Sequence, residues 1–291
     1  MLLTILRPVW NLPDGDYAPY EPMHIVSVVG ARPQFVKLSP VARALQGHAS
    51  VRHSVVHTGQ HYDDRMSRVF FEQLALPLPD ENLAVGSGQH GEQTGEMLVQ
   101  LEGWMQQSAP DAVLVYGDTN STLAATLAAA KLHIPIAHIE AGLRSFNRLM
   151  PEEINRLVAD HCSDRLYAPT PKALDNLQSE RLGDRSILTG DVMRDAVLFY
   201  QDVAARESQI LQSLGLEARE YGVLTLHRPA TTRPEVLMET LSLLSRLSSE
   251  SLPLVFPMHP RTKAVLSNAG VEISGDMRVI EPVGYLDMIQ L

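Results

Sequence analysis

From His24 onward, the sequence alternates between apolar runs of strand length and longer amphipathic stretches. Short apolar runs bounded by turn signals favour buried strands, whereas longer stretches with a helical period favour helices. A chain that repeats this alternation forms βαβ units around a parallel sheet. The pattern therefore predicts an α/β protein.

The alternation divides into two series. The first predicts strands at 24–30, 54–59, 111–117, 134–140 and 165–170, and helices at 33–46, 63–75, 90–107, 120–133, 151–163 and 171–182. A fresh series begins at Tyr221, with strands at 221–227, 252–259 and 277–283 and a helix at 234–249. We therefore expect an N-terminal extension (1–23), a first domain (24–200) and a second domain (201–291), with the boundary inside 190–215. The second series is short for a doubly wound domain, so we expect that domain to be incomplete.

The composition of the chain limits the kinds of partner that we expect it to bind. The formal net charge of −10 argues against a nucleic-acid surface, and no apolar stretch is long enough to predict a membrane span. Cys162 is the only cysteine, which excludes an intrachain disulfide and a cysteine metal cluster and fits a reducing compartment. The first 22 residues lack the basic region and cleavage site of a signal peptide. We therefore expect a cytoplasmic protein with a poorly ordered N-terminal extension.

In open α/β sheets, ligands bind beyond the carboxyl ends of the strands, so the residues that follow each strand are the candidates. Gly30 follows the first predicted strand, and Arg32 and Lys37 lie near the start of a helix whose amides favour anions. These two cations are candidates for phosphate contact or are ordinary surface charges. The segment is not a GxGxxG motif, and the chain has neither a P-loop nor a GxSxG motif, so the sequence gives no support for NAD binding.

Three further segments place polar groups at the same edge of the sheet: TGQHYD (58–63), YGDTNST (116–122) and HIEAGLRS (138–145). Asp118 is either a site carboxylate or a helix N-cap. Glu140 ends an apolar run, where a carboxylate needs a partner or a raised pKa and can serve as a proton acceptor. The alternative for Glu140 is a structural ion pair with Arg144 or His138.

Two other groups of residues have a functional and a structural interpretation. Glu152, which follows Pro151, either stabilises a helix start through the helix dipole or belongs to the site. Arg156 lies four residues later, at the spacing for an ion pair with Glu152 on one helix face. His227, followed by Arg228, ends one predicted strand of the second domain, and His259 occupies the equivalent position on the next strand. These histidines face a ligand or are structural. Their spacing does not match an HxxxH or HxH metal site.

Seven segments, in this order and spacing, resemble the non-hydrolysing UDP-N-acetylglucosamine 2-epimerases: GARPQFVKLSPV, TGQHYD, VYGDTNSTLAA, HIEAGLRSFNRLMPEEINR, TGDVMRDA, TLHR and PMHPRT. The resemblance covers residues 24–291 and is strongest in the long motif at 138–156. The variant SFNRLMPEEINR is most similar to the branch that includes epimerases of related UDP-2-acetamido sugars.

The resemblance implies two Rossmann-like domains in the GT-B arrangement, with a nucleotide sugar in the cleft between them. Family members remove the C2 proton and expel UDP, then return UDP and a proton on the opposite face, without a redox cofactor. By motif position, the resemblance implies acid/base roles for Asp118, Glu140 and Glu152, and a role for His227 beside the departing diphosphate. The substrate-binding positions that it implies are Arg32, Lys37, His61, Arg144, Arg228 and His259.

Other readings stay open from the sequence. A hydrolysing epimerase uses the same first half-reaction, a GT-B glycosyltransferase fits the fold but not the PEEINR segment, and a non-catalytic binding protein retains only the first domain's interface. The resemblance also implies a homodimer. The family normally continues past the segment EPVGYLDMIQL with a TDSGG-like loop that binds UDP. We therefore expect the 291-residue chain to bind UDP poorly and to turn over slowly or not at all.

Overall fold

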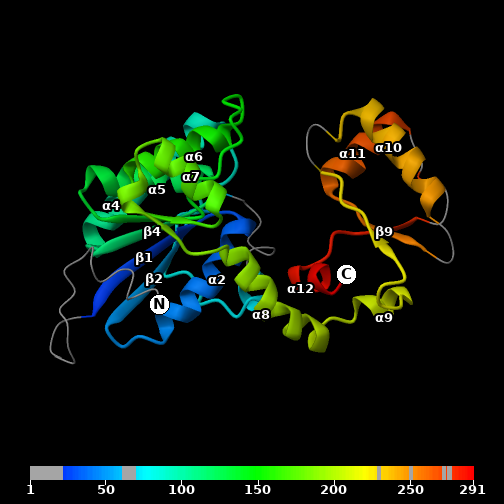
Figure 1. Ribbon diagram of the computed structural model, residues 1–291, viewed down its shortest axis with the longest axis horizontal. Coiled ribbons are helices and arrows are strands. Elements are labelled where there is room, and N and C mark those ends of the chain that lie inside the picture. Colours follow the sequence, from blue (N-terminus) through cyan, green and yellow to red (C-terminus); the bar gives the residue numbers. More distant parts are fainter. Residues whose placement is uncertain (1–21, 61–69, 228–230, 249–251, 271–272, 274–276) are drawn as a thin grey trace. The chain divides into compact units, whose positions relative to one another are not determined.

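The computed structural model describes residues 22–60, 70–227, 231–248, 252–270, 273 and 277–291 (Figure 1). The predicted N-terminal extension and most of the predicted helix at 63–75 lie outside these residues. The chain forms two compact units, residues 1–197 and 198–291. The boundary between the two predicted domains, at residues 200 and 201, remains our proposal.

The first unit is built on a seven-stranded sheet with the order β3-β2-β1-β4-β5-β6-β7, in which every neighbouring pair is parallel. The strands are β1 (Met23–Val29), β2 (Val51–His57), β3 (Glu81–Asn82), β4 (Ala112–Tyr116), β5 (Ile136–Ile139), β6 (Arg165–Ala168) and β7 (Ser186–Leu188). The α/β class is confirmed. The five strands predicted for this region are all present. The other two, β3 and β7, were not predicted, because they contain only two and three residues.

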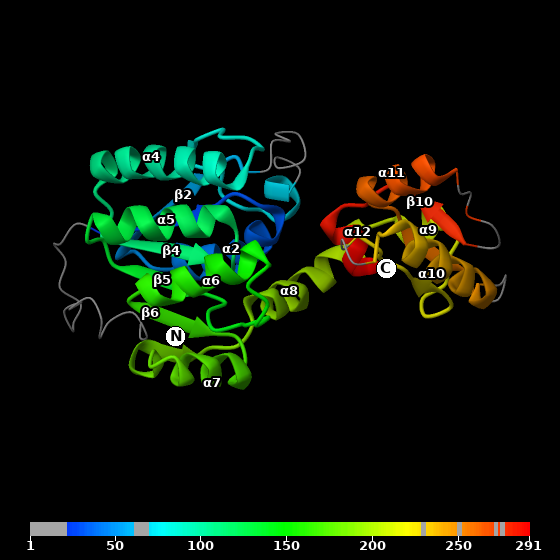
Figure 2. The same ribbon diagram turned by 90° about the horizontal axis from the view of Figure 1, so that it is seen from above.

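Helices cover both faces of this sheet. They are α2 (Arg32–Gln46), α4 (His90–Ser108), α5 (Asn120–Lys131), α6 (Pro151–Cys162) and α7 (Pro171–Ser179), with a short 3-10 turn, η1 (Gly183–Arg185). A further helix, α8 (Val192–Glu207), spans the boundary between the units. Figures 1 and 2 show α4, α5, α6 and α7 over one face and α2 over the other.

Small side chains explain why α5 can pack between two other helices. Ala124, Ala125 and Ala128 of α5 are buried, and they meet Met97 and Leu101 of α4 in the core above the sheet. The distance between packed helices depends on the side chains at the contact, so alanines allow a close approach. Burial of each large apolar side chain contributes about 1.5–3 kcal/mol. This packing holds the amino end of α5 against the edge of the sheet.

The strand order defines where a crevice must lie. The chain runs from β1 outward to β2 and β3, and then returns to place β4 on the other side of β1. Ligands bind in open α/β sheets at such a switch point, beyond the carboxyl ends of the strands. Gly30 is required there, because a Cβ at this position would lie 2.0 Å from Thr58 Oγ1 and 2.2 Å from Ser121 Oγ. The carboxyl ends of β1 and β2 and the amino end of α5 are thus packed too closely for a residue larger than glycine at position 30.

The second unit contains a parallel sheet with the order β10-β9-β8. Its strands are β8 (Gly222–Val223), β9 (Leu254–Pro257) and β10 (Arg278–Ile280), and its helices are α9 (Ile210–Leu214), α10 (Pro234–Leu247), α11 (Pro260–Ala269) and α12 (Tyr285–Gln290). Leu237, Phe256 and Leu266 are buried in its core. Within the described residues, no helix is both long and apolar enough to cross a membrane.

One predicted strand of the second unit is wrong over much of its length. The apolar run at 221–227 predicted a strand, but strand pairing is confined to Gly222–Val223. Beyond it, the Leu226 carbonyl accepts a hydrogen bond from the Thr262 hydroxyl, and the His227 carbonyl accepts one from Arg261 Nη1 at 3.3 Å. Side chains of α11 therefore replace the strand ladder at this point.

Candidate active site

The turn between β4 and α5 brings Asp118 to the switch point. Gly117 has a φ of +65°, and a Cβ there would lie 2.7 Å from Lys37 Nζ. Asp118 Oδ2 accepts a hydrogen bond from Arg156 Nη2 at 2.7 Å. The N-cap interpretation of Asp118 is wrong, because Thr119 caps α5 and its side chain accepts from the Thr122 amide. The Asp118 carboxylate is therefore available for another role.

Glu140 directly follows β5 and is held in a strained conformation. Its φ is +68°, a left-handed value that costs a non-glycine residue about 1–3 kcal/mol. Its Oε1 accepts from Lys37 Nζ at 2.8 Å and from Arg156 Nη2 at 3.0 Å, and its side chain is 11% exposed. Glu140 is thus ion-paired, as the structural alternative supposed, but the partners are not Arg144 or His138.

Arg156 connects the two carboxylates. Burial alone would lower its pKa, but the charges of Asp118 and Glu140 raise the pKa above the ordinary value. Arg156 also donates to the Glu140 carbonyl through Nη1. The i,i+4 spacing predicted a pair with Glu152, and this prediction is wrong because Arg156 is buried against the strand ends while Glu152 is exposed. Together, Lys37, Asp118, Glu140 and Arg156 form a four-charge cluster with no net charge.

A pocket of about 250 Å³ lies beside this cluster. Its lining residues are Asp118, Leu143, Arg144, Ser145, Met150, Glu152, Glu153 and Arg156. Within the described part of the chain, Glu152 makes no hydrogen bond or ion pair. The pocket therefore combines a carboxylate held by Arg156 with a carboxylate that is unpaired.

Glu153 fixes the loop at the rim of this pocket. Its Oε2 accepts from the Ser145 amide and hydroxyl, each at 2.8 Å, and its Oε1 accepts from the Phe146 amide at 3.2 Å. Burial alone would raise the pKa of Glu153, but these hydrogen bonds and the charge of Arg144 lower it below the ordinary value. The loop carries Phe146 and Leu149 outward, with 74% and 92% of each residue exposed. One carboxylate thus sets the position of an apolar rim.

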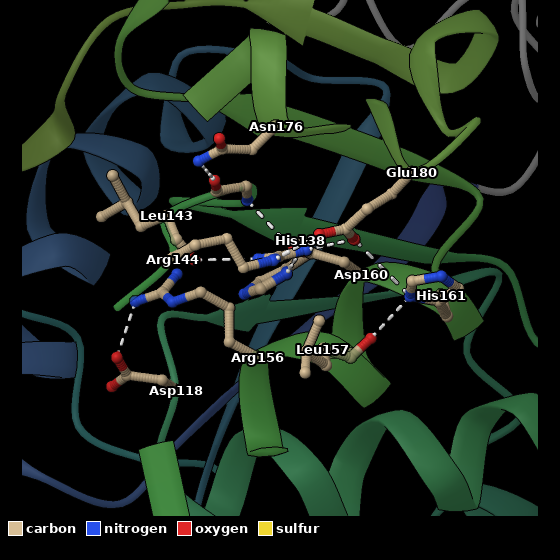
Figure 3. Close-up of polar contacts among 12 residues, drawn as sticks. Asp118, His138, Leu143, Arg144, Arg156, Leu157, Asp160, His161, Asn176 and Glu180 are labelled. Atoms are coloured by element: carbon tan, nitrogen blue, oxygen red, sulfur yellow. Dashed lines mark hydrogen bonds and ion pairs between the residues drawn. The ribbon is translucent and has the colours of Figure 1, made fainter. Parts of the chain in front are cut away.

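Arg144 lines the pocket, but its guanidinium is held by other residues (Figure 3). Nη1 lies 2.7 Å from Asp160 Oδ2, while Nε and Nη2 donate to Glu180 at 2.8 and 2.7 Å. The side chain is 1% exposed. This geometry favours a structural role for Arg144, and its contact with substrate stays a prediction.

Two further candidates for substrate binding, Arg32 and Lys37, lie on α2. Arg32 is the first residue of α2, and its guanidinium carbon lies 5.7 Å from the centre of the Phe70 ring. Lys37, expected near the nucleotide, forms its ion pair with Glu140 instead of pointing to open solvent. Gln34 Oε1 accepts from the Gly30 and Ala31 amides at 2.8 and 3.1 Å. The side chain of Gln34 therefore occupies two of the backbone amides at the start of α2.

In the second unit, the two predicted histidines meet. The rings of His227 and His259 are exposed and lie 5.9 Å apart between centroids. His259 Nδ1 accepts from the Arg261 amide at 3.1 Å and caps α11. His61 and Arg228 lie outside the described residues. Among the residues that the structure describes, no group of three or more His, Cys, Asp or Glu side chains is arranged to hold a metal ion.

Sequence reasoning missed several residues that shape this site. Gln34 closes the start of α2, Asn155 Nδ2 donates to the Asp118 carbonyl at 2.9 Å, and Arg156 joins the carboxylates. Gln34 and Asn155 carry no charge, and amides at helix surfaces are common. The one available signal was the repeated placement of polar residues on helices that start at the switch point.

Comparison with known proteins gives a consistent result. The profile of the family described as UDP-N-acetylglucosamine 2-epimerase matches residues 43–291. The UDP-2,3-diacetamido-2,3-dideoxy-D-glucuronate 2-epimerase of Pseudomonas aeruginosa is 46% identical over 274 residues, which cover 92% of this chain and 75% of that protein.

Solved structures agree with the sequence comparison. The UDP-GlcNAc 2-epimerase of Methanocaldococcus jannaschii, in complex with UDP-GlcNAc and UDP, has a TM-score of 0.82 at 39% identity and covers 91% of this chain and 75% of that one. The UDP-GlcNAc 2-epimerase of Neisseria meningitidis, bound to UDP-GlcNAc, has a TM-score of 0.83 at 28% identity and covers 92% and 75%.

Proposed function

The chain belongs to the UDP-N-acetylglucosamine 2-epimerase family, and from this membership we propose that it inverts C2 of a UDP-2-acetamido sugar. The substrate is UDP-N-acetylglucosamine, interconverted with UDP-N-acetylmannosamine, or a related sugar such as the diacetamido glucuronate of the Pseudomonas aeruginosa relative. The reaction proceeds by removal of the C2 proton and elimination of UDP from C1. UDP then rejoins C1, and a proton is added to C2 on the opposite face of the ring.

The arrangement of three carboxylates carries this proposal. Inversion at a carbon requires proton transfer on both faces of the sugar, so a single acid/base group does not suffice. Asp118 and Glu140 are held by Arg156, while the unpaired Glu152 lines the pocket that also contains Asp118. The site thus offers two fixed carboxylates and, at the start of α6, a third carboxylate that has no partner among the described residues.

The cations of the site have two roles in this proposal. Lys37 and Arg156 hold Glu140 in place and offset its largely buried charge, and Arg156 also holds the partly exposed Asp118. The departing diphosphate also needs positive charge or fixed donors. We assign that role to Arg32, Arg228, His227 and His259, with His61 on the substrate side.

Product analysis tests the proposal. UDP-N-acetylglucosamine and its diacetamido glucuronate relative are each incubated with the chain, and the products are identified by proton and phosphorus NMR. A C2-inverted sugar still attached to UDP supports the proposal. Release of free UDP and an inverted free sugar identifies the hydrolysing reaction instead, and an unchanged substrate in both cases contradicts catalysis by this chain.

We also propose a cytoplasmic homodimer. The single cysteine fits a reducing compartment, and the resemblance to the epimerase family implies a dimer through the first domain. Light scattering coupled to gel filtration should give about twice the 32.1 kDa chain mass. A mass of one chain at micromolar concentration would rule out a stable dimer.

A further inference from the structure

His138 lies inside β5, and both nitrogen atoms of its ring meet oxygen atoms. Nδ1 lies 2.7 Å from Asp160 Oδ1 (Figure 3). Nε2 lies 2.7 Å from the carbonyl oxygen of Gly117. The ring is fully buried. It therefore connects the end of β4 with helix α6 from within the core, without facing the pocket described above.

Both oxygen atoms are acceptors. A backbone carbonyl oxygen can only accept a hydrogen bond. Asp160 also accepts from the Gly142 amide at 3.1 Å and pairs with Arg144 Nη1 at 2.7 Å. Both of these groups contact Oδ2, and the charged guanidinium of Arg144 favours the ionised carboxylate. The Asp160 carboxylate therefore carries no proton on Oδ1 and cannot donate to the ring.

A histidine placed between two acceptors must carry a proton on each ring nitrogen. In either neutral tautomer, one nitrogen lone pair would face an oxygen lone pair at 2.7 Å. The charged groups around the ring are Asp160 of α6, Arg144 of the loop after β5, and Glu180 at the end of α7. With a charged His138, these four groups carry no net charge, which meets the requirement that buried charges be paired.

We propose that His138 is a buried imidazolium that positions the two fixed carboxylates of the site. The residue after Gly117 is Asp118, so the hydrogen bond to the Gly117 carbonyl holds the turn that presents Asp118. Glu140 follows His138 along the same chain segment, so the anchoring of the ring also fixes the strained Glu140 backbone. His138 is a positioning residue, because its own side chain touches neither the pocket nor the reacting atoms. The kinetic part of this proposal rests on the proposed epimerase function.

Nitrogen NMR tests the charge state without any substrate. The chain is labelled with ¹⁵N-histidine, and the His138 signals are assigned by their loss in His138→Gln. We expect both ring nitrogens to show the protonated, imidazolium pattern at neutral pH. The exposed His133 provides the reference signals. A neutral single-tautomer pattern for His138 at neutral pH would overturn the proposal.

Two variants separate the two hydrogen bonds. The amide of His138→Asn can still donate to Asp160 Oδ1 but is too short to reach Gly117. The amide of His138→Gln can reach Gly117 but leaves Asp160 Oδ1 without the donor that His138 supplies. We expect both to lower kcat for C2 inversion by roughly 10- to 100-fold, with KM changed less than about threefold, because small displacements of catalytic groups act on the transition state. His133→Asn is the control, since His133 is exposed at a φ of 58°, which asparagine tolerates.

The backbone amide signals of Gly117 and Asp118 give a second readout. These signals should shift in His138→Asn and stay near their positions in His133→Asn. An unchanged kcat together with unshifted Gly117 and Asp118 signals in His138→Asn would contradict a positioning role. If the wild-type chain inverts no UDP-2-acetamido sugar, the proposed function fails, but the nitrogen pattern and the Gly117 signals still decide the structural proposal.

Discussion

Arg156 donates to Asp118 and to Glu140, so one buried guanidinium holds two candidate catalytic carboxylates together. The same residue also donates to the Glu140 backbone carbonyl, at a position where φ is +68°. Strained residues persist only where their surroundings over-determine them. The cluster thus explains both how Glu140 tolerates its conformation and why its carboxylate has a fixed position.

Glu140→Gln tests the role of this carboxylate. Loss of an acid/base group typically lowers rates by about 10²- to 10⁴-fold, and we expect C2 inversion to fall within this range. Lys37 and Arg156 would also lose a charged partner, at a cost of about 1–3 kcal/mol in the free energy of unfolding. Turnover assays and urea unfolding measure the two effects.

Glu102→Gln is the matched control, because Glu102 is an exposed glutamate on α4, away from the cluster. It should change neither the rate nor the unfolding midpoint beyond experimental error. A Glu140→Gln chain that retains more than about one tenth of the wild-type rate would show that Glu140 is not required for proton transfer.

Gly117→Ala tests how tightly the cluster is packed. The new Cβ would meet Lys37 Nζ at 2.7 Å, and the positive φ of Gly117 adds backbone strain. Gly270→Ala is the comparison, since Gly270 has a φ of +63° but no atom within 4 Å of the added Cβ. We expect Gly270→Ala to cost only about 1 kcal/mol of stability and Gly117→Ala to lose most of the activity as well. Equal effects of the two substitutions on both quantities would argue against close packing at Gly117.

Among the elements, those with a long periodic pattern were predicted and those defined by tertiary contacts were not. The apolar period of α2, α4, α5 and α6 revealed each helix from local sequence. By contrast, β3 contains only two residues, and most of the strand expected at 221–227 is absent because Thr262 and Arg261 take its carbonyls. The apolar period of a sequence does not show whether side chains will compete with a strand for its backbone hydrogen bonds.

The same distinction holds for the candidate site. Glu140 was found because a carboxylate that ends an apolar run is unusual, and Asp118 was found because YGDTNST places polar residues at the end of a predicted strand. Their partner Arg156 was assigned to Glu152 by the helical i,i+4 rule, but a buried ion pair with two carboxylates takes precedence over an exposed local pair. Which helix face turns inward depends on the whole sheet, so this pairing could not be read from spacing.

Glu153, which holds the loop at the pocket rim, should make the stability of the folded chain depend on pH in the acidic range. Its pKa lies below the ordinary value of 4.5, so its ionised form stabilises the folded state. That contribution is complete above pH 4.5 and is lost as the pH falls through the lowered folded value. We expect Glu153→Gln to be less stable than the wild type in urea at pH 7, with the difference shrinking below pH 4.5.

Glu102→Gln again supplies the comparison, because it removes one carboxylate without affecting the loop. Its stability should follow the wild type at both pH values. A Glu153→Gln deficit that stays constant into acid would mean that the charge of Glu153 does not hold Ser145 and Phe146.

On the scale of the whole molecule, candidate residues occur on both compact units. The carboxylates and their cations belong to residues 1–197, and the His227 and His259 pair belongs to residues 198–291. The likeness to the Methanocaldococcus jannaschii structure covers 91% of the chain and so extends over both units. The family assignment therefore rests on the whole described fold and not on one motif.

In the proposed reaction, this chain removes and returns the C2 proton of a UDP-2-acetamido sugar. The most direct measurement is incubation with UDP-N-acetylglucosamine in deuterated water, followed by NMR of the C2 position. The diacetamido glucuronate sugar is incubated in the same way. We expect an inverted C2 that carries deuterium, and we expect this product to be lost in Glu140→Gln. Absence of deuterium from C2 of both sugars would show that the chain does not exchange this proton.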